Sequence, residues 1–237
     1  WLATWFMDQG WSLKKLHRLL VTSRAYQQQV LQRAPEVDPD NRLLSGFPLR
    51  RLEAEEIRDA LWHVSGSLEL AVGGKTVPLR NRQFVFNHTS KDATNYESRR
   101  RSLYLPIIRN HLYEFLAQFD HPDPSMPTGS RATSVIAPQA LLLMNSPTAL
   151  EASAALTEVL LKERAGELQS VDRMHRLFER ALGRPADPVE VRECADFLRA
   201  YDASLASEQS DPEERLRQSW EALSQTVLIS NEFLYLR

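Results

Sequence analysis

The sequence ALGRPADPVE at residues 181–190 ends one predicted helix and begins the next. Gly183 suits the left-handed backbone position that terminates many helices. Asp187 and Glu190 form a capping box, and the proline between them is favoured in a first helical turn. The same D-P-x-E arrangement recurs at residues 211–214. These two boundaries predict that the last hundred residues are helical.

Helical signals also dominate upstream of this stretch. Ser12 can cap a helix that carries a leucine stripe, and Ser146-Pro147 can open another. The predicted helices occupy residues 2–9, 13–21, 52–65, 111–119, 146–164, 170–182, 188 onward and 212 onward. The predicted core draws on Leu16, Leu20, Leu61, Leu141, Leu142, Leu156, Leu177, Phe197, Leu223 and Phe233.

The middle of the chain has a different composition. Residues 72–75 read VGGK and predict a tight hairpin turn, while residues 83–86 and 102–105 have strand composition. Residues 119–131 contain three prolines and a glycine, which predicts a long ordered loop or a lid. We therefore expect a mainly α multi-helix bundle with a small β-hairpin and loop insertion at residues 72–135.

Composition limits the function classes. Of the 237 residues, 43% are hydrophobic and 25% are charged, as in ordinary folded proteins. A net charge of -2 argues against nucleic-acid partners, and no apolar run approaches the length of a membrane span. A single cysteine, Cys194, excludes an internal disulfide, a redox pair and covalent haem attachment within this chain.

Known catalytic patterns are not found in the sequence. The histidines lack the spacing of a helix-borne zinc pair, and no nucleophile elbow, P-loop or dinucleotide fingerprint occurs. The chain opens WLATWFMDQGW, which reads as the inside of a helix without a signal peptide. We therefore expect one helical domain over residues 1–237 that is the C-terminal part of a longer protein, although a complete small protein is the alternative.

Five arginines form the first candidate site, which would bind anions. They are Arg99, Arg100, Arg101, Arg109 and Arg131. Guanidinium groups suit carboxylates, sulfates and phosphates because they donate paired hydrogen bonds. The alternative is a solvated charge run, or ion pairing with the acidic helix that begins near Glu53.

Two carboxylates form the second candidate. Asp120 and Asp123 lie in the proline-stiffened loop. Such a pair could act as an acid and a base or could ligate a cation. Asp residues beside proline also commonly make local turns, and this alternative stays open. The two candidates together predict a pocket in which the loop folds back onto the arginine segment.

Several separated segments carry a family resemblance. They are WSLKKLHRLLVTSRAYQQ (11–28), NRLLSGFPLRRLEAEEIRDALWHVSGSL (41–68), RRRSLYLPIIRN (99–110), FDHPDPS (119–125), TSVIAPQALLLMNSP (133–147), ALGRPADPVE (181–190) and SNEFLYLR (230–237). Together they resemble the planctomycete-type domain of unknown function 1553 over nearly the whole chain. The resemblance supplies no catalytic residue.

The resemblance implies a place in a longer exported protein. Members of this family usually carry the domain at the C-terminus, often with a cytochrome c-like domain upstream. It therefore implies an extracytoplasmic location, upstream domains of the same polypeptide as partners, and haem c in an upstream domain with no cofactor in this chain.

Three functional hypotheses follow. The favoured one is a non-catalytic structural or interaction domain, for which support of redox or polysaccharide-handling modules is one expected role. The alternative is an enzyme or half-site that acts on an anionic carbohydrate polymer through the arginine and aspartate pocket. The third is a redox accessory that docks a cytochrome domain.

Overall fold

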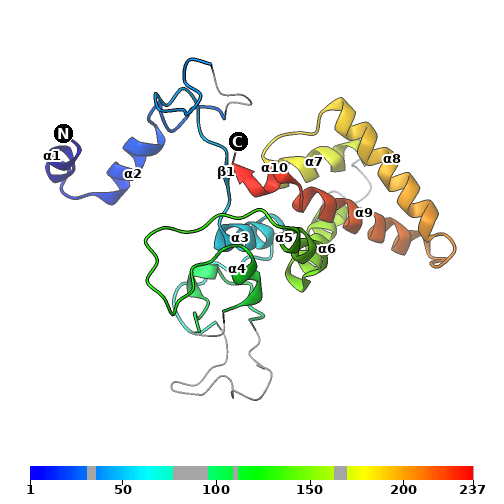
Figure 1. Cartoon of the computed structure of the whole chain (residues 1–237). Helices are drawn as coiled ribbons and strands as arrows, with labels where there is room; N and C mark the ends of the chain where they lie inside the picture. Colours follow the sequence, from blue (N-terminus) through cyan, green and yellow to red (C-terminus); the bar gives the residue numbers. More distant parts are fainter. Residues whose placement is uncertain (31–35, 77–95, 109–111, 163–169, 237) are drawn as a thin grey trace. The chain divides into compact units, whose positions relative to one another are not determined.

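The computed structural model describes residues 1–30, 36–76, 96–108, 112–162 and 170–236. Within these ranges the regular structure consists of ten α-helices, a short 3-10 helix and one two-stranded sheet (Figure 1). The prediction of a mainly helical fold is therefore confirmed. The chain divides into two compact units: unit 1 is residues 1–51 with 235–237, and unit 2 is residues 52–234.

Unit 1 contains helices α1 (Leu2–Asp8) and α2 (Leu13–Val21). The predicted cap of α2 is confirmed, because the Ser12 hydroxyl accepts a hydrogen bond from Lys15 N at 3.4 Å. Neither helix contains a buried residue. The prediction of Leu20 as a core residue is therefore wrong, since its side chain is 45% exposed.

The two-stranded sheet also belongs to unit 1. Strand β1 (Arg50–Arg51) pairs antiparallel with β2 (Tyr235–Leu236). Arg50 lies opposite Leu236, and Arg51 lies opposite Tyr235. The C-terminal residues are therefore fixed by main-chain hydrogen bonds to a segment far away in the sequence.

Unit 2 holds the remaining helices. They are α3 (Ala54–Val64), the 3-10 helix η1 (Ser102–Tyr104), α4 (Glu114–Gln118), α5 (Ala137–Asn145), α6 (Pro147–Lys162), α7 (Ser170–Leu182), α8 (Pro188–Leu205), α9 (Pro212–Leu228) and α10 (Asn231–Leu234). Asp187 accepts hydrogen bonds from two backbone N–H groups of α8, and Asp211 accepts one from α9. Both predicted helix starts are confirmed.

The core of unit 2 forms where α6 packs against α9 and α3, and where α9 also packs against α8. Five predicted core residues are buried: Leu61, Leu156, Leu177, Leu223 and Phe233. The hydroxyl groups of Thr157 and Ser224 form a buried hydrogen bond of 3.0 Å between α6 and α9.

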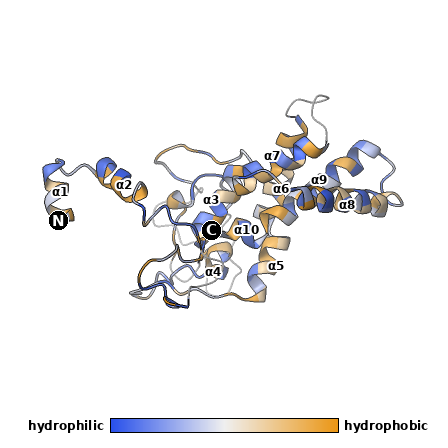
Figure 2. Ribbon diagram, turned by 90° about the horizontal axis from the view of Figure 1, so that it is seen from above, coloured by the Kyte–Doolittle hydropathy of each residue, from blue (hydrophilic) through white to orange (hydrophobic). Residues whose placement is uncertain are grey.

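The predicted contribution of α5 to the core is only partly right. Leu143 is 1% exposed, whereas the predicted core residue Leu141 is 57% exposed. Helix α5 is apolar on more than one face, so one apolar face stays at the surface (Figure 2).

The predicted strand at residues 102–105 is wrong, because this segment forms η1. Side chains of α3, rather than a neighbouring strand, satisfy its polar groups, as described below. The turn at Gly73 and Gly74 has the expected left-handed backbone, with φ of 71° and 82°. The predicted strand at 83–86 lies outside the described residues.

Candidate functional site

Helix α3 carries the side chains that organise the candidate site. Glu53 and Glu56 form a capping box at its start. Gly66 follows its end with a left-handed φ of 73°. Arg58 and Trp62 are four residues apart, so they lie on the same face of the helix, and both are buried.

Arg58 binds the segment that precedes η1. Its Nη1 donates to Arg100 O at 2.9 Å and to Ser102 Oγ at 3.2 Å, and its Nη2 donates to Ser98 O. Burial lowers the pKa of Arg58 from its usual value, although Tyr113 and the neighbouring aspartate oppose this effect. An arginine nevertheless stays protonated. The buried Arg58 cation therefore binds residues 98–102 through their backbone carbonyl and serine hydroxyl oxygens.

Asp59 holds the same segment from the next position of α3. Its Oδ1 accepts hydrogen bonds from Ser102 N and Ser102 Oγ, both at 2.7 Å. Arg58 and Asp59 therefore supply adjacent donors and acceptors to one stretch of backbone. This pairing explains why residues 102–104 need no strand partner.

Arg100 extends the contact to the glycine turn. Its Nη2 donates to Ala71 O at 2.7 Å and to Gly73 O at 2.5 Å. Its guanidinium group also lies 4.7 Å from the centre of the Tyr104 ring. Arg100 is buried, and its hydrogen bonds fix the 71–74 turn.

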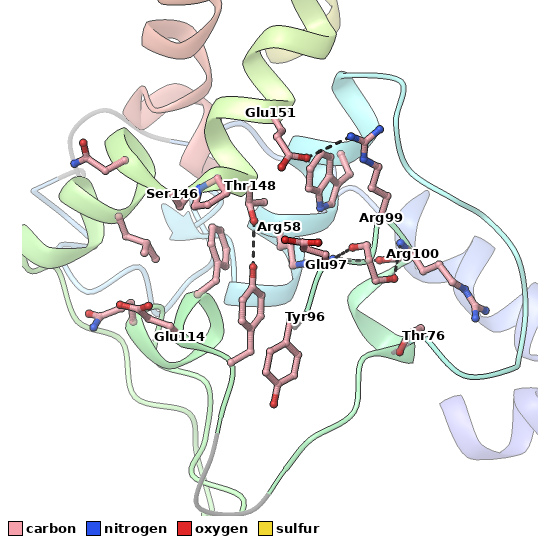
Figure 3. Close-up of a pocket in the computed structure, with 18 of the residues that line it drawn as sticks. Arg58, Thr76, Tyr96, Glu97, Arg99, Arg100, Glu114, Ser146, Thr148 and Glu151 are labelled. Carbon is pink, nitrogen blue, oxygen red and sulfur yellow. Dashed lines mark hydrogen bonds and ion pairs between the residues drawn. The ribbon is translucent and has the colours of Figure 1, made fainter. Parts of the chain in front are cut away.

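A cleft of about 1030 Å³ lies beside this assembly (Figure 3). Its walls come from α3, residues 69–76, residues 96–100, residues 113–118 and the junction of α5 with α6. Arg58 and Arg100 both line it. The arginine contacts described above therefore hold one wall of the cleft in place.

Aromatic residues form much of the cleft interior. The Tyr96 and Tyr113 rings stack with centroids 4.9 Å apart, and the Tyr113 hydroxyl lies 3.1 Å from Thr148 Oγ1. The Arg99 guanidinium lies 5.3 Å from the centre of the Trp62 ring. Trp62 is 4% exposed and Tyr96 is 8% exposed. These rings therefore form the wall itself and present little open face.

The Trp62 indole has an unusual hydrogen-bonding state. Its Nε1 is buried and has no acceptor among the described residues. A buried donor without an acceptor costs about 1–3 kcal/mol, so such groups in folded proteins call for an explanation. Because Trp62 is one of the residues that line the cleft, this unsatisfied donor belongs to the cleft wall.

Charged side chains surround the cleft mouth. Arg99 forms an ion pair of 3.3 Å with Glu151, and both side chains are about half exposed (51% and 52%). Figure 3 shows these two groups directed toward each other. Glu69, Glu97 and Glu114 also line the cleft and are exposed, as is Lys75.

The predicted anion-binding arginines lie in three different environments. Arg99 and Arg100 line the cleft. Arg101 is exposed and lines a second cleft of about 710 Å³. Arg131 pairs with the acidic start of α3, which is the alternative left open by the sequence. Arg109 lies outside the described residues.

The two predicted carboxylates, Asp120 and Asp123, accept hydrogen bonds from serines of the same loop region. Asp120 has a left-handed φ of 61° and accepts hydrogen bonds from Ser134 N at 2.9 Å and Ser134 Oγ at 2.6 Å. Asp123 accepts from Ser125 N at 2.8 Å, and this bond with that of the Ser125 hydroxyl lowers its pKa. Neither aspartate is among the described residues that line the cleft.

Arg131 ties the proline-rich loop to α3. It donates to Glu53 at 2.5 Å and to both carboxylate oxygens of Glu55 at 2.9 Å. His121 Nε2 lies 3.3 Å from Glu55 Oε1, which is an ion pair when the ring is protonated. Burial raises the pKa of Glu55, but the Arg131 bond and the charges of Arg131 and His121 outweigh this effect and lower it below 4.5.

The lowered pKa of Glu55 predicts a contribution to acid stability. A carboxyl group whose pKa is depressed by folding stabilises the protein above its unfolded pKa, and the contribution is lost as pH falls through the folded pKa. We expect Glu55→Gln to flatten the fall in the free energy of unfolding below pH 4.5. The effect is below about 1 kcal/mol because the pair is partly solvated.

Urea unfolding at several pH values between 3 and 7 measures this contribution. Glu151→Gln is the matched control, since Glu151 pairs with Arg99 in a more exposed setting. An unchanged pH slope in Glu55→Gln contradicts the prediction.

Two searches of the described residues were negative. They contain no group of three or more histidine, cysteine, aspartate or glutamate residues placed to hold a metal ion. None of their helices combines the length and apolar character that a bilayer span requires.

Sequence reasoning missed the residues that shape the cleft. Arg58 and Trp62 are not among the site residues predicted from the sequence. Their four-residue spacing was the available signal, because it puts a cation and an aromatic ring on one helix face. Tyr113 and Glu151 carried no local signal.

The fold and the cleft together define a mainly helical protein whose cleft is supported by buried arginines. A family model described as "PSD1: Protein of unknown function (DUF1553)" matches residues 1–198. The chain therefore belongs to this family, and every residue that lines the cleft lies within the match. No curated protein and no solved structure matches the chain.

Proposed function

We propose that this chain is a non-catalytic interaction domain and that the cleft of unit 2 is its binding site. The observation that carries the proposal is the buried Trp62 N–H, which has no acceptor within the described part of the chain and belongs to the wall of a cleft of about 1030 Å³. Sites that bind small ligands or chain segments combine such a concave surface with a few unsatisfied polar groups.

The candidate catalytic groups form hydrogen bonds within the protein, which supports a binding function more than a catalytic one. Asp120 and Asp123 accept hydrogen bonds from nearby serines. The Arg100 guanidinium group donates its hydrogen bonds to backbone carbonyl groups. Groups held in this way stabilise the fold, so the arginine and aspartate pocket of the enzyme hypothesis lacks its acid and base.

The proposal extends to the setting of the domain. We propose an extracytoplasmic location and neighbouring domains of the same polypeptide as partners, among them one that carries haem c. Support comes from the resemblance of the sequence to the domain of unknown function 1553, whose members usually belong to exported proteins. Reading the gene upstream of the Trp1 codon tests this part, since a signal sequence and a CxxCH motif are expected there.

A side-chain NMR measurement tests the binding site. We expect a chemically diverse fragment library to contain compounds that shift the Trp62 indole resonance of the full chain. Trp62→Phe is expected to weaken these compounds by about tenfold, which corresponds to about 1.4 kcal/mol for one lost hydrogen bond. The variant is expected to stay folded, because phenylalanine keeps most of the ring volume and the lost N–H has no acceptor among the residues that the structure describes.

Trp220 provides the internal control. It is buried in α9 and does not line the cleft, so its indole resonance is expected to stay in place. Fragments that shift Trp220 but leave Trp62 unmoved contradict the proposed site. Equal binding to the wild-type chain and to Trp62→Phe contradicts the role of the N–H.

A further inference from the structure

Aliphatic side chains form one rim of the cleft. Pro138, Leu141 and Leu142 of α5 line it, and Leu141 is 57% exposed. Hydrophobic residues are visible along α5 in Figure 2. Exposed apolar surface beside a polar cleft is typical of surfaces that bind other molecules. The occupant therefore brings apolar groups to this rim.

The aromatic rings of the cleft do not offer a sugar-stacking platform. Trp62 and Phe115 are 4% and 2% exposed, so their faces are covered. Among the described lining residues the exposed apolar side chains are leucine and proline, whereas Tyr113 is half-buried. Aliphatic side chains of a polypeptide fit such a surface better than the flat face of a sugar ring does.

The cleft also presents one donor and one acceptor that suit a peptide group. Trp62 Nε1 has a hydrogen to donate. Asn145 is exposed and uses its Nδ2 to donate to Leu141 O at 2.8 Å, and its Oδ1 is an amide acceptor. A polypeptide carries a carbonyl group and an N–H at each residue, so it can use both.

The accessible charges at the cleft favour a basic partner. Among the described lining residues, the exposed acidic ones are Glu69, Glu97, Glu114 and Glu151, and the exposed cations are Lys75 and Arg99, of which Arg99 pairs with Glu151. The two further cations, Arg58 and Arg100, are 1% and 8% exposed, and their hydrogen bonds go to protein oxygens. Among the described residues, a partner at the mouth therefore meets more exposed carboxylates than exposed cationic groups.

We infer that the cleft binds a polypeptide segment that carries aliphatic and basic side chains. Aliphatic residues pack on the Leu141 rim, and a lysine or arginine lies near the carboxylates. This inference rests on the proposed function, because it names the partner class of the same site. It replaces the anionic polysaccharide that the arginine run had suggested.

Four pools of fluorescent twelve-residue peptides test the inference with the full chain. The pools are aliphatic-basic, aliphatic-acidic, aliphatic-neutral and basic without aliphatic residues. We expect the first pool to bind at least tenfold more tightly than the others. Its affinity should fall as salt rises, because charge attraction is screened.

Matched variants localise the binding. We expect Leu141→Ser to weaken the aliphatic-basic pool at least fivefold, whereas Met144→Ser has little effect, since Met144 is also exposed on α5 but is not among the described residues that line the cleft. Glu114→Gln should weaken the same pool about threefold. Glu158→Gln is its control, because Glu158 lies on α6 outside the cleft.

The Trp62 indole signal distinguishes a failure of the proposed binding site from a failure of the inferred polypeptide partner. If neutral oligosaccharides shift this signal and peptides do not, the site stands and the peptide inference is overturned. Tighter binding of the acidic pool overturns the charge argument and with it the inference. If no peptide, sugar or fragment shifts the signal, the proposed function and the inference both fail.

Discussion

Replacing Arg58 with methionine is expected to lower the free energy of unfolding by about 3–5 kcal/mol. Methionine keeps most of the length of the side chain but donates no hydrogen bond. Ser98 O, Arg100 O and Ser102 Oγ then lose their donor in a largely buried setting. Each unsatisfied group costs about 1–3 kcal/mol, so the loss is a large part of the stability of an ordinary domain. Urea unfolding followed by circular dichroism measures it.

Arg99→Met is the matched control for this prediction. Arg99 lines the same cleft, but its side chain is 51% exposed and its one ion pair is at the surface. Its replacement is expected to change stability by less than about 1 kcal/mol. Arg58→Lys should recover little, because one ammonium group cannot match the donors of a guanidinium fork. Similar losses in Arg58→Met and Arg99→Met would refute the structural role given to Arg58.

Helix boundaries were predictable because their causes are local. The Asp187 carboxylate accepts hydrogen bonds from N–H groups two and three residues later. Gly183 has the left-handed φ of 73° that its position in the sequence implied. A reader of the sequence sees every residue that takes part in such a cap. The same reasoning holds for Asp211 and α9.

The conformation of residues 98–104 was not predictable in this way. Its partners Arg58 and Asp59 lie forty or more residues earlier in the sequence. The bond between Arg58 and Arg100 spans 42 residues, and the bond between Asp59 and Ser102 spans 43. Apolar residues at 103 and 105 favoured a strand. The side-chain contacts from α3 favour a 3-10 turn instead, and no local pattern shows them.

The same distinction between local and long-range causes applies to the candidate site. Local turns of Asp123 were an open alternative in the sequence, and the structure has them. The pairing of Arg131 with α3 was also an open alternative. The cleft itself is assembled from five separate stretches of unit 2. The empty acceptor position at Trp62 depends on all of them together, so only the three-dimensional structure shows it.

The second large effect is expected in the core of unit 2. Trp220 lies in α9, which packs against α6, α7 and α8, and its side chain is 1% exposed. Trp220→Ala removes a large buried ring that neighbouring helices cannot fully replace. We expect the free energy of unfolding to fall by about 3–5 kcal/mol, and Trp220→Phe to cost clearly less because most of the ring volume is kept.

Trp1→Ala gives the comparison with an exposed tryptophan, since Trp1 is 83% exposed. Its replacement is expected to stay within about 0.5 kcal/mol of the wild-type chain. Far-UV circular dichroism in urea follows all three variants, because it does not depend on tryptophan fluorescence. A loss below about 1 kcal/mol in Trp220→Ala would mean that α9 is not packed on α6 as described. The Thr157–Ser224 hydrogen bond between the same helices would then also be in error.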